Sequence, residues 1–333
     1  MKPKITIALA TFNSSDYTKF FLKNLKKNVQ TPYELIIVDN NSTDGTKEFL
    51  SNLKDTKVIL NKRNLGFGPA NNQAFSKCKT EYFMGVNNDT VIFPGFIEHM
   101  LNFMDTHPKY GELGCHSNCI GAKNPITKRG INKEIEDLQK TTLSVFEAFD
   151  KYFPDQNKFY NDFMNKNPRI QNIVVPPNFI GGWCFLVRTK DTKKIGKLFD
   201  KRFKIGFWED VDLSWRIANT GLKIGLLQGA YIHHFNHSSF NASKDKLPKS
   251  DHAISKQNGL LFVEKWSDTI KQVLKKYFDD GKNLKQIMTK NFIFKVYFRK
   301  ANKEIPEFEK KLKENFVYKL GVSVKDFLTI IKR

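Results

Sequence analysis

Four short apolar runs, each followed by helical spacing or a polar loop, constrain the fold of this chain more than any other feature. They lie in KITIALATFN, YELIIVDNN, KVIL and TEYFMGVNNDT, at residues 4–13, 33–41, 57–60 and 80–90. Continuous apolar runs of this length are typical of strands covered on both faces. Strands that alternate with helices at this spacing predict an α/β fold with a mainly parallel central sheet.

The second half of the chain is less regular. We interpret residues 110–175 as an insertion of loops around one helix, after which strand and helix patterns resume. Residues 244–333 hold 22 Lys and Arg against 11 Asp and Glu, and their pattern is mainly helical. We therefore expect one α/β domain over residues 1–240 and a basic, mainly helical C-terminal region over residues 241–333.

The charge of the chain favours an anionic partner. Its 333 residues carry a formal net charge of +21, which suits nucleic acid, an anionic membrane surface or a phosphorylated substrate. No arginine-rich or zinc-finger pattern supports a nucleic-acid partner, so we expect none. The four cysteines form no CxxC pair, which indicates reduced thiols.

The apolar runs are too short for targeting or membrane segments. The first is shorter than a signal peptide requires, and none approaches the roughly 18 apolar residues of a membrane span. We therefore expect a cytoplasmic protein. Lysines and aromatic residues mix in KQVLKKYF, NFIFKVYFRK and FEKKLKENFVYKL, near the C-terminus. This mixture is typical of helices with one packed face, and its alternative is peripheral contact with anionic lipid on the inner face of the cell membrane.

Polar side chains follow three of the predicted strands: Thr11 and Asn13, then Asp39, then Asn87–Asp89. Each alone would also suit a helix cap or a turn. Together they indicate a ligand site, because open α/β sheets bind ligands at the carboxyl ends of their strands. The first strand–helix loop, TFNSSDYT, contains no glycine, which disfavours a dinucleotide-binding or P-loop protein. Asp89 suits a divalent cation whose shell is completed by phosphate oxygens.

A cluster of carboxylates lies in GFWEDVDLSWRI, at a predicted helix start. Glu209, Asp210 and Asp212 would also interact favourably there with the helix dipole. Trp208 precedes them as an aromatic wall, and Arg216 is spaced to pair with Asp212. Asp210 is our candidate general base for an attacking hydroxyl.

Three histidines lie close together in YIHHFNHSS. His233 and His234 would face opposite sides of a strand, so only one of them can reach a shared site. Imidazole binds Mn²⁺-like ions alongside carboxylates. A structural histidine and a metal ligand are both compatible with this pattern.

Seven stretches in this order resemble family 2 glycosyltransferases with a GT-A fold. They are ATFN, IIVDNNSTDGT, NLGFGPANN, VNNDT, GGWCFLVR, WEDVDLSWRI and HHFNHSS, spread over roughly residues 4–240. The resemblance implies a nucleotide-sugar donor linked to UDP, dTDP or GDP, and Mn²⁺ or Mg²⁺ as cofactor. It also implies inverting transfer to a hydroxyl of a glycan or lipid-linked glycan, in surface polysaccharide synthesis.

The resemblance further implies roles for individual residues. The donor would be bound by Thr11, Asn13, Asp39, Arg63, Asn64, Gly66, Asn87 and Asn88. The acceptor would lie against the insertion and against Gly182, Trp183 and Trp208. Asp89 and His233 would bind the metal, and Glu209 and Asp210 match the catalytic acidic pair, with Asp210 as the base. Asn87 replaces the first Asp of Asp-x-Asp, as in the rhamnosyltransferase-like branch, and this implies a weaker metal site or more reliance on His233.

Two other functions fit part of the pattern. A nucleotide-sugar- or carbohydrate-binding protein could keep the fold without catalysis, although Asp89, Glu209 and Asp210 are all retained. A nucleotidyltransferase on a similar sheet would need a glycine-rich, basic loop after the first strand, and NSSDYTK lacks glycine. The catalytically degenerate binding protein is the alternative to a glycosyltransferase.

Overall fold

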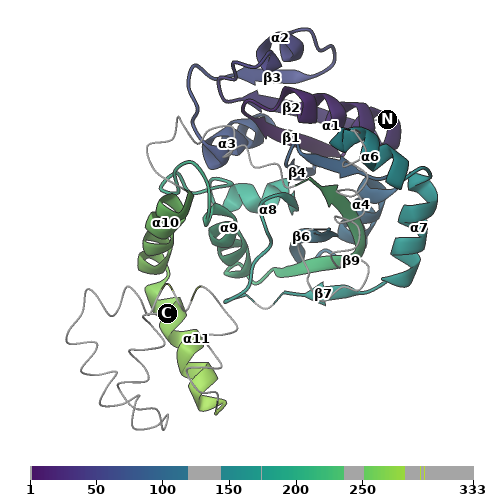
Figure 1. The fold of residues 1–333 in the computed structure, drawn as a ribbon. Helices are drawn as coiled ribbons and strands as arrows, with labels where there is room; N and C mark the ends of the chain where they lie inside the picture. The colour runs from purple at the N-terminus through teal and green to yellow at the C-terminus, as the bar shows by residue number, and fades with distance from the viewer. Residues whose placement is uncertain are drawn as a thin grey trace.

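The computed structural model describes most of the chain. The described residues are 2–118, 144–173, 175–235 and 251–281, with 293 and 296. The first half alternates strand and helix as predicted (Figure 1). Its elements are β1 (Ile5–Thr11), α1 (Ser15–Asn28), β2 (Tyr33–Asp39), α2 (Thr46–Ser51), β3 (Lys57–Leu60), α3 (Phe67–Lys77), β4 (Tyr82–Val86), β5 (Thr90–Ile92) and α4 (Phe96–Thr106).

The second half adds strands to the same sheet and ends in two helices. Its elements are β6 (Tyr110–Ser117), α6 (Val145–Tyr152), α7 (Gln156–Lys166), β7 (Ile170–Asn172), β8 (Cys184–Arg188), α8 (Thr189–Lys194), α9 (Glu209–Ala218), β9 (Lys223–His234), α10 (Asp251–Lys265) and α11 (Ser267–Asp279). In the described part of the chain, α10 and α11 are the predicted helical extension.

A nine-stranded sheet runs through the described residues. Its order is β3-β2-β1-β4-β8-β6-β9-β5, and β7 pairs with β9. Strands β1 to β4 are parallel to one another. Because β8 is antiparallel to both β4 and β6, β6 and its parallel neighbour β9 share the direction of β1 to β4. Only β5, β7 and β8 oppose it. The predicted α/β fold with a mainly parallel sheet is confirmed.

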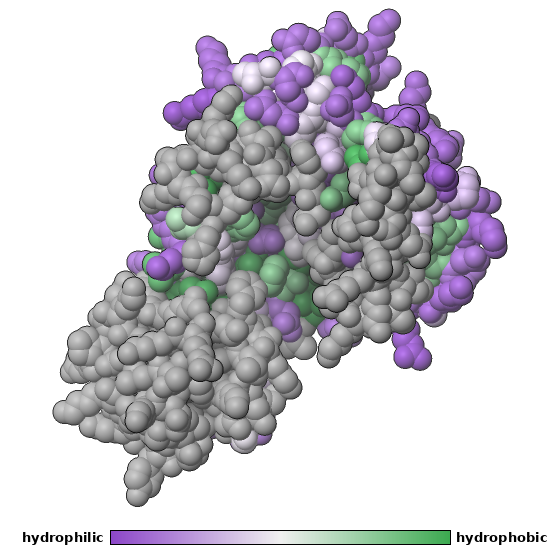
Figure 2. Space-filling model, in the orientation of Figure 1, coloured by the Kyte–Doolittle hydropathy of each residue, from purple (hydrophilic) through white to green (hydrophobic). Residues whose placement is uncertain are grey.

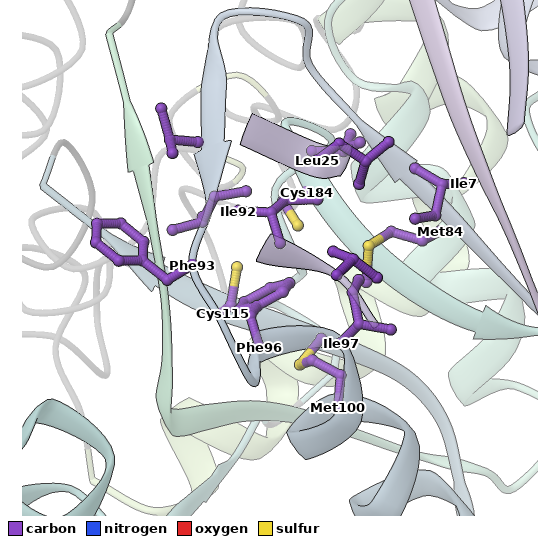
Figure 3. Close-up of a cluster of buried hydrophobic side chains, with 14 of the residues drawn as sticks. Ile7, Leu25, Met84, Ile92, Phe93, Phe96, Ile97, Met100, Cys115 and Cys184 are labelled. Atoms are coloured by element: carbon purple, nitrogen blue, oxygen red, sulfur yellow. The ribbon is translucent and has the colours of Figure 1, made fainter. Parts of the chain in front are cut away.

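Helices cover both faces of the sheet, as its continuous apolar strands require. Ile7 and Leu9 of β1 pack into one cluster with α1 and α4, while Ala8 between them packs toward α3 and α9. Figure 3 shows part of the first cluster, where Met84 of β4 lies near Ile97 of α4. In the view of Figure 2, hydrophilic residues cover most of the surface over α2 and β3.

Strand β6 corrects one expectation, because residues 110–117 were assigned to an insertion. They form a buried strand between β8 and β9. The strand was missed because YGELGCHS contains two glycines and a glutamate, which weaken a strand pattern. The glycines permit close packing: a Cβ at Gly111 would lie 2.6 Å from Ile217 Cγ2, and one at Gly114 would lie 2.8 Å from Ile180 Cγ2.

The C-terminal helices share a hydrophobic cluster with α9. Trp208 and Trp215 pack against Phe262 of α10, with ring centroids 5.1 and 4.9 Å apart. Trp266 and Ile270 extend the cluster. Figure 1 shows α10 beside α9. The described C-terminal helices are therefore packed on the domain rather than separate from it.

The C-terminal lysine-rich stretches are described only in part. KQVLKKYF lies in α11, NFIFKVYFRK is described only at 293 and 296, and FEKKLKENFVYKL lies outside the described residues. Among the helices that the structure describes, none combines the length and apolar character that a membrane span requires.

Candidate active site

The ends of β1, β2 and β4 meet, as the polar strand ends predicted. Thr11 and Asp39 are register partners at the last positions of β1 and β2. Asn88, after β4, donates hydrogen bonds from Nδ2 to Oγ1 of Thr11 at 3.2 Å and to Oγ1 of Thr18 at 2.9 Å. Thr11 and Asn88 are buried in this network, so their side chains hold the strand ends together.

Asp39 presents one buried oxygen toward the strand ends. Its Oδ2 accepts hydrogen bonds from the backbone amides of Asn41 and Ser42, at 3.0 and 2.9 Å. Its Oδ1 is buried and has no hydrogen-bond partner among the described residues. A buried acceptor without a partner is costly unless a ligand supplies a donor. Asp39 is thus suited to bind an N–H or O–H group.

Asn13 joins the loops that follow β1 and β2. It has a positive φ of 47°. Its Oδ1 accepts a hydrogen bond from the amide of Thr43 at 2.8 Å, and its own amide donates to Oγ of Ser42 at 2.9 Å. Asn13 therefore shapes the loop beside Asp39.

Asn40 supports the loop after β3 and was not among the predicted residues. Its Oδ1 accepts from Nδ2 of Asn61 at 2.9 Å, and its Nδ2 donates to the carbonyl of Gly66 at 3.2 Å. Within the same loop, Oδ1 of Asn64 accepts from the amide of Gly66 at 2.8 Å, and Arg63 is exposed. The only signal for Asn40 was its place in the polar run after Asp39.

Gly66 brings this loop into contact with the turn before α9. Its φ is +88°, and a Cβ there would lie 2.4 Å from Cα of Ile205. The next amide, of Phe67, donates to the carbonyl of Ile205 at 2.7 Å. Only glycine combines this backbone conformation with so close an approach.

His234, and not His233, lies beside Asp89. Nε2 of His234 is 3.2 Å from Oδ1 of Asp89, and the indole of Trp183 stacks on the imidazole with centroids 5.5 Å apart. His233 points to the other side of β9, where its ring lies 5.0 Å from that of Phe149. Burial, with a smaller contribution from His234, lowers the pKa of His233 to about 3. The structure does not bring the predicted ligand His233 to Asp89.

Asp89 and His234 have the spacing of neighbouring ligands on one cation. Two ligands about 2.1 Å from an octahedral ion, at right angles, are roughly 3 Å apart, and the observed separation is 3.2 Å. In the part of the chain that the structure describes, no three His, Cys, Asp or Glu side chains form a metal-binding group. A cation held by these two residues could complete its shell with phosphate oxygens and water, as in many Mg²⁺ sites.

Asp210 is held at the start of α9 by two backbone amides. Its Oδ2 accepts from the amide of Gly182 at 2.9 Å, and its Oδ1 accepts from that of Val211 at 2.8 Å. Burial raises the pKa of Asp210, and these hydrogen bonds oppose that shift. A Cβ at Gly182 would lie 3.3 Å from Cβ of Asp210, so glycine permits this close approach.

Glu209 is buried beside Asp210. Burial, and then the charge of Asp210, raises the pKa of Glu209 to about 8. Its Oε2 has no hydrogen-bond partner among the described residues. Because Asp210 alone receives amides from two other residues, the arrangement favours a protonated Glu209 beside an ionised Asp210.

Gly182 and Trp183 connect the candidate base, Asp210, with the candidate metal pair, Asp89 and His234. Gly182 donates to Asp210, while the adjacent Trp183 stacks on His234 and its carbonyl accepts from the amide of Asn87 at 2.9 Å. One dipeptide thus contacts the candidate base, the candidate metal pair and the end of β4.

Trp208, which was expected beside the acceptor, packs its indole against the C-terminal helices. It is buried against α10, and a Cβ at Gly259 would lie 2.8 Å from its indole. Its left-handed φ of 75° accompanies this placement in the C-terminal cluster. Trp183, the other tryptophan expected on the acceptor side, lies beside His234.

Asp212 binds α10, not the site. Its carboxylate pairs with Arg216 at 2.8 Å, as the spacing predicted, and with Nζ of Lys265 at 2.6 Å. It also accepts a hydrogen bond from Nε1 of Trp266 at 2.9 Å. Asp212 is fully buried, so these partners compensate for its lost hydration.

Glu112 is a buried acid that the sequence did not reveal. It accepts a hydrogen bond from Oγ of Ser214 at 2.7 Å, and that Oγ accepts from the amide of Ile180 at 3.0 Å. Burial, opposed by the Ser214 hydrogen bond, raises the pKa of Glu112 to about 8. A lone glutamate between glycines gives no sequence signal for such a place.

Comparisons with known proteins agree with this architecture. The family model of glycosyl transferase family 2 matches residues 6–176. An uncharacterized glycosyltransferase of Rickettsia typhi is 26% identical over 211 residues, which are 63% of this chain and 57% of that protein. The chain therefore spans little more than half of that relative.

Solved structures of S. aureus TarS 1-349 are similar in fold. One is 16% identical and covers 99% of this chain and 90% of that chain, with a TM-score of 0.52. The other, in complex with UDP-GlcNAc, is 15% identical and covers 97% of this chain and 77% of that chain, with a TM-score of 0.50. At these identities the likeness shows the fold alone, and the predicted GT-A fold is confirmed. By the match over half of its length, the chain belongs to glycosyl transferase family 2.

Proposed function

We propose that this chain is an inverting, metal-dependent glycosyltransferase. It moves a sugar from a nucleotide-sugar donor to a hydroxyl of a glycan or lipid-linked glycan in surface polysaccharide synthesis. The observation that carries this proposal is the contact of the Gly182–Trp183 dipeptide with both Asp210 and His234. This contact supports a single site in which a candidate base and a candidate cation pair act on one substrate.

The donor is a sugar linked to UDP, dTDP or GDP. The unpartnered Oδ1 of Asp39 accepts a hydrogen bond from the base or the ribose. Asn13, Asn40, Asn64 and Gly66 shape the loops around it. The UDP-GlcNAc bound to TarS in one similar structure supports a nucleotide-sugar donor.

The metal is Mn²⁺ or Mg²⁺, held by Asp89 and His234. Their spacing fits one cation, and a mixed carboxylate and imidazole pair suits Mn²⁺. When bound, the cation neutralises the charge of the leaving nucleoside diphosphate. With Asn87 in place of a second carboxylate, the protein supplies few ligands of its own.

Asp210 is the general base. It takes the proton of the acceptor hydroxyl while the bond from the anomeric carbon to the donor oxygen breaks and the bond to the acceptor oxygen forms. A single displacement of this kind inverts the anomeric centre and needs no covalent intermediate. The raised pKa of Asp210 makes it a stronger base than an exposed aspartate. The hydrogen bond from the amide of Gly182 fixes the orientation of the Asp210 carboxylate relative to the acceptor hydroxyl.

The protein acts in the cytoplasm, peripherally on the inner face of the membrane, where a lipid-linked acceptor is presented. The formal net charge of +21 supports attraction to anionic lipid. The surface that carries this contact is the basic C-terminal region.

A donor panel tests the proposed function. UDP-, dTDP-, GDP- and CMP-sugars are incubated with Mn²⁺ or Mg²⁺, and released nucleotide is measured, with UTP as a nucleotidyltransferase control. We expect turnover of one donor that requires metal and is lost in Asp210→Asn and Asp89→Ala. If no donor in the panel releases nucleotide but calorimetry still detects donor binding, the result would instead support the catalytically degenerate binding protein.

A further inference from the structure

The turn that leads into the catalytic pair has an uncommon backbone. Ile205, Phe207 and Trp208 all have positive φ, at 72°, 72° and 75°. Such angles are rare for residues other than glycine and are outliers for a β-branched or bulky side chain. They persist where surrounding contacts determine them. The turn ends directly at Glu209, so its shape sets where α9 begins.

Asn258 of α10 holds this turn from one side. Its Nδ2 lies 3.2 Å from the carbonyl oxygen of Lys204, 2.8 Å from that of Gly206 and 3.2 Å from that of Phe207. The side chain is 3% exposed, so water does not compete for these contacts. One side-chain amide group therefore contacts three backbone carbonyls of the turn.

Neighbouring contacts hold the same turn and the start of α9. Gly259, next to Asn258, has no Cβ and so lets the indole of Trp208 pack against α10. At the end of α10, Lys265 and the following residue, Trp266, bind Asp212 in the first turn of α9. On the opposite side, Ile205 pairs with Gly66. The turn is thus held between the loop after β3 and α10.

We propose that Asn258 is a positioning residue for the transfer reaction. By holding the carbonyls of Lys204, Gly206 and Phe207, it fixes the direction in which Asp210 presents its carboxylate to the acceptor hydroxyl. This inference rests on the proposed function. It extends the catalytic machinery to α10, which lies outside the residues 6–176 that the family model matches.

A positioning role differs from a stabilising one in its kinetic effect. A misdirected base slows the chemical step and leaves donor affinity intact, so kcat falls and the donor KM does not. A residue that only stabilises the fold lowers the melting temperature and spares the kcat of the folded enzyme. The two roles are therefore separable.

The test uses two variants of Asn258 in the full chain and a matched control. Asn258→Ala removes the amide, and Asn258→Asp keeps its size without its donor. Asn28→Ala is the control, because Asn28 is also a buried asparagine whose Nδ2 donates twice, to Ile92 and Gln156, both at 2.7 Å. It lies at the end of α1, away from the turn before α9.

With the donor identified by the panel, we expect kcat to fall at least tenfold in both Asn258 variants, with donor KM within twofold. Asn28→Ala should keep kcat within twofold, although its melting temperature falls. If the Asn258 variants lose melting temperature like Asn28→Ala and keep kcat within twofold, Asn258 only stabilises the fold and the inference is wrong.

Hydrogen exchange provides a readout that does not depend on activity. Backbone amides of residues 205–213 should exchange at least tenfold faster in Asn258→Ala than in wild type, and not in Asn28→Ala. Unchanged exchange there would overturn the inference even if the enzyme is active. A wild-type protein that turns over no donor would refute the proposed function, while faster exchange would still support Asn258 as the residue that holds the turn.

Discussion

The imidazole of His234 lies 3.2 Å from the carboxylate of Asp89, at the junction of β9 and the end of β4. Sheet register produces this contact, because β5 pairs with β9 and places Thr90 opposite His234. Asp89 immediately precedes Thr90 and so reaches the same edge. The pairing of this three-residue strand thus brings Asp89 to the one of two adjacent histidines that lies on its side of β9.

The first prediction concerns the metal. His234→Ala removes one of the two proposed protein ligands, so we expect the Mn²⁺ concentration for half-maximal activity to rise by about tenfold or more. His233→Phe is the matched control, because His233 packs among aromatic rings and faces away from Asp89. It should leave the Mn²⁺ dependence unchanged. An effect of His233→Phe equal to that of His234→Ala would contradict this assignment.

The second prediction separates the two acids of the catalytic pair. Asp210→Asn should lower kcat by about 100- to 10,000-fold, the usual effect of losing a general base. Glu209→Gln should lower it far less at pH 7, since glutamine resembles the protonated side chain that burial favours. Both variants should bind the donor like wild type in calorimetry. If kcat falls more in Glu209→Gln than in Asp210→Asn, Glu209 is the general base instead of Asp210.

The third prediction is the pH dependence of activity. Glu209 ionises as pH rises through about 8, which puts a second negative charge beside Asp210. We expect a change in kcat in that range for wild type and its absence in Glu209→Gln, measured from pH 6 to 9.5. Identical profiles would show that Glu209 is not the titrating group.

The fourth prediction concerns stability and Glu112, far inside the domain. Its pKa in the folded protein is raised to about 8, above the ordinary value of 4.5. The unfolded chain therefore loses this proton first, and stability falls as pH rises from about 4.5 to about 8. Glu112→Gln keeps a hydrogen-bonding group for Ser214 and cannot ionise. Its melting temperature should fall less than that of wild type between pH 5 and 9.

A pair of glycine substitutions tests the contact between the donor loop and the turn before α9. Gly45 and Gly66 share a φ of +88°, but ψ is -2° at Gly45 and 174° at Gly66, and a Cβ at Gly45 meets nothing within 4 Å. Gly45→Ala should cost about 1–2 kcal/mol of stability from its backbone alone. Gly66→Ala should cost about 3 kcal/mol or more, because its Cβ also meets Ile205 and because its combination of φ and ψ is open almost only to glycine. Urea unfolding measures both, and equal costs would mean that the loop can move away from Ile205.

The fold and the strand ends were predictable because local patterns specify them. Asp39 and Asp89 follow apolar runs, and this pattern can be recognised in the sequence without knowledge of tertiary contacts. The glycines of β6 permit close packing, Gly111 against Ile217 of α9 and Gly114 against Ile180, and their presence weakened the strand pattern in the sequence. Which of His233 and His234 lies beside Asp89 could not be predicted, because the contact depends on the pairing of β5 with β9, two strands that are far apart in the sequence.

The acidic run before α9 shows the same limit within one helix. Glu209, Asp210 and Asp212 look equivalent in sequence, yet only tertiary partners distinguish them. Asp210 meets the amide of Gly182, while Asp212 meets Lys265 and Trp266, whose positions no local pattern reveals. Trp208 was misplaced for the same reason, because its indole packs against a helix 50 residues later, at Gly259 and Phe262.

The cluster shared by α9, α10 and α11 bears on how the enzyme should be produced. An expression fragment cut at residue 240 would bare the indoles of Trp208 and Trp215 to solvent and strip Asp212 of Lys265 and Trp266. Such a fragment would aggregate or misfold. Its lack of activity in an assay would not test whether the full chain is a glycosyltransferase. The smallest fragment worth purifying extends at least through Leu274, well past the boundary that family similarity alone suggests.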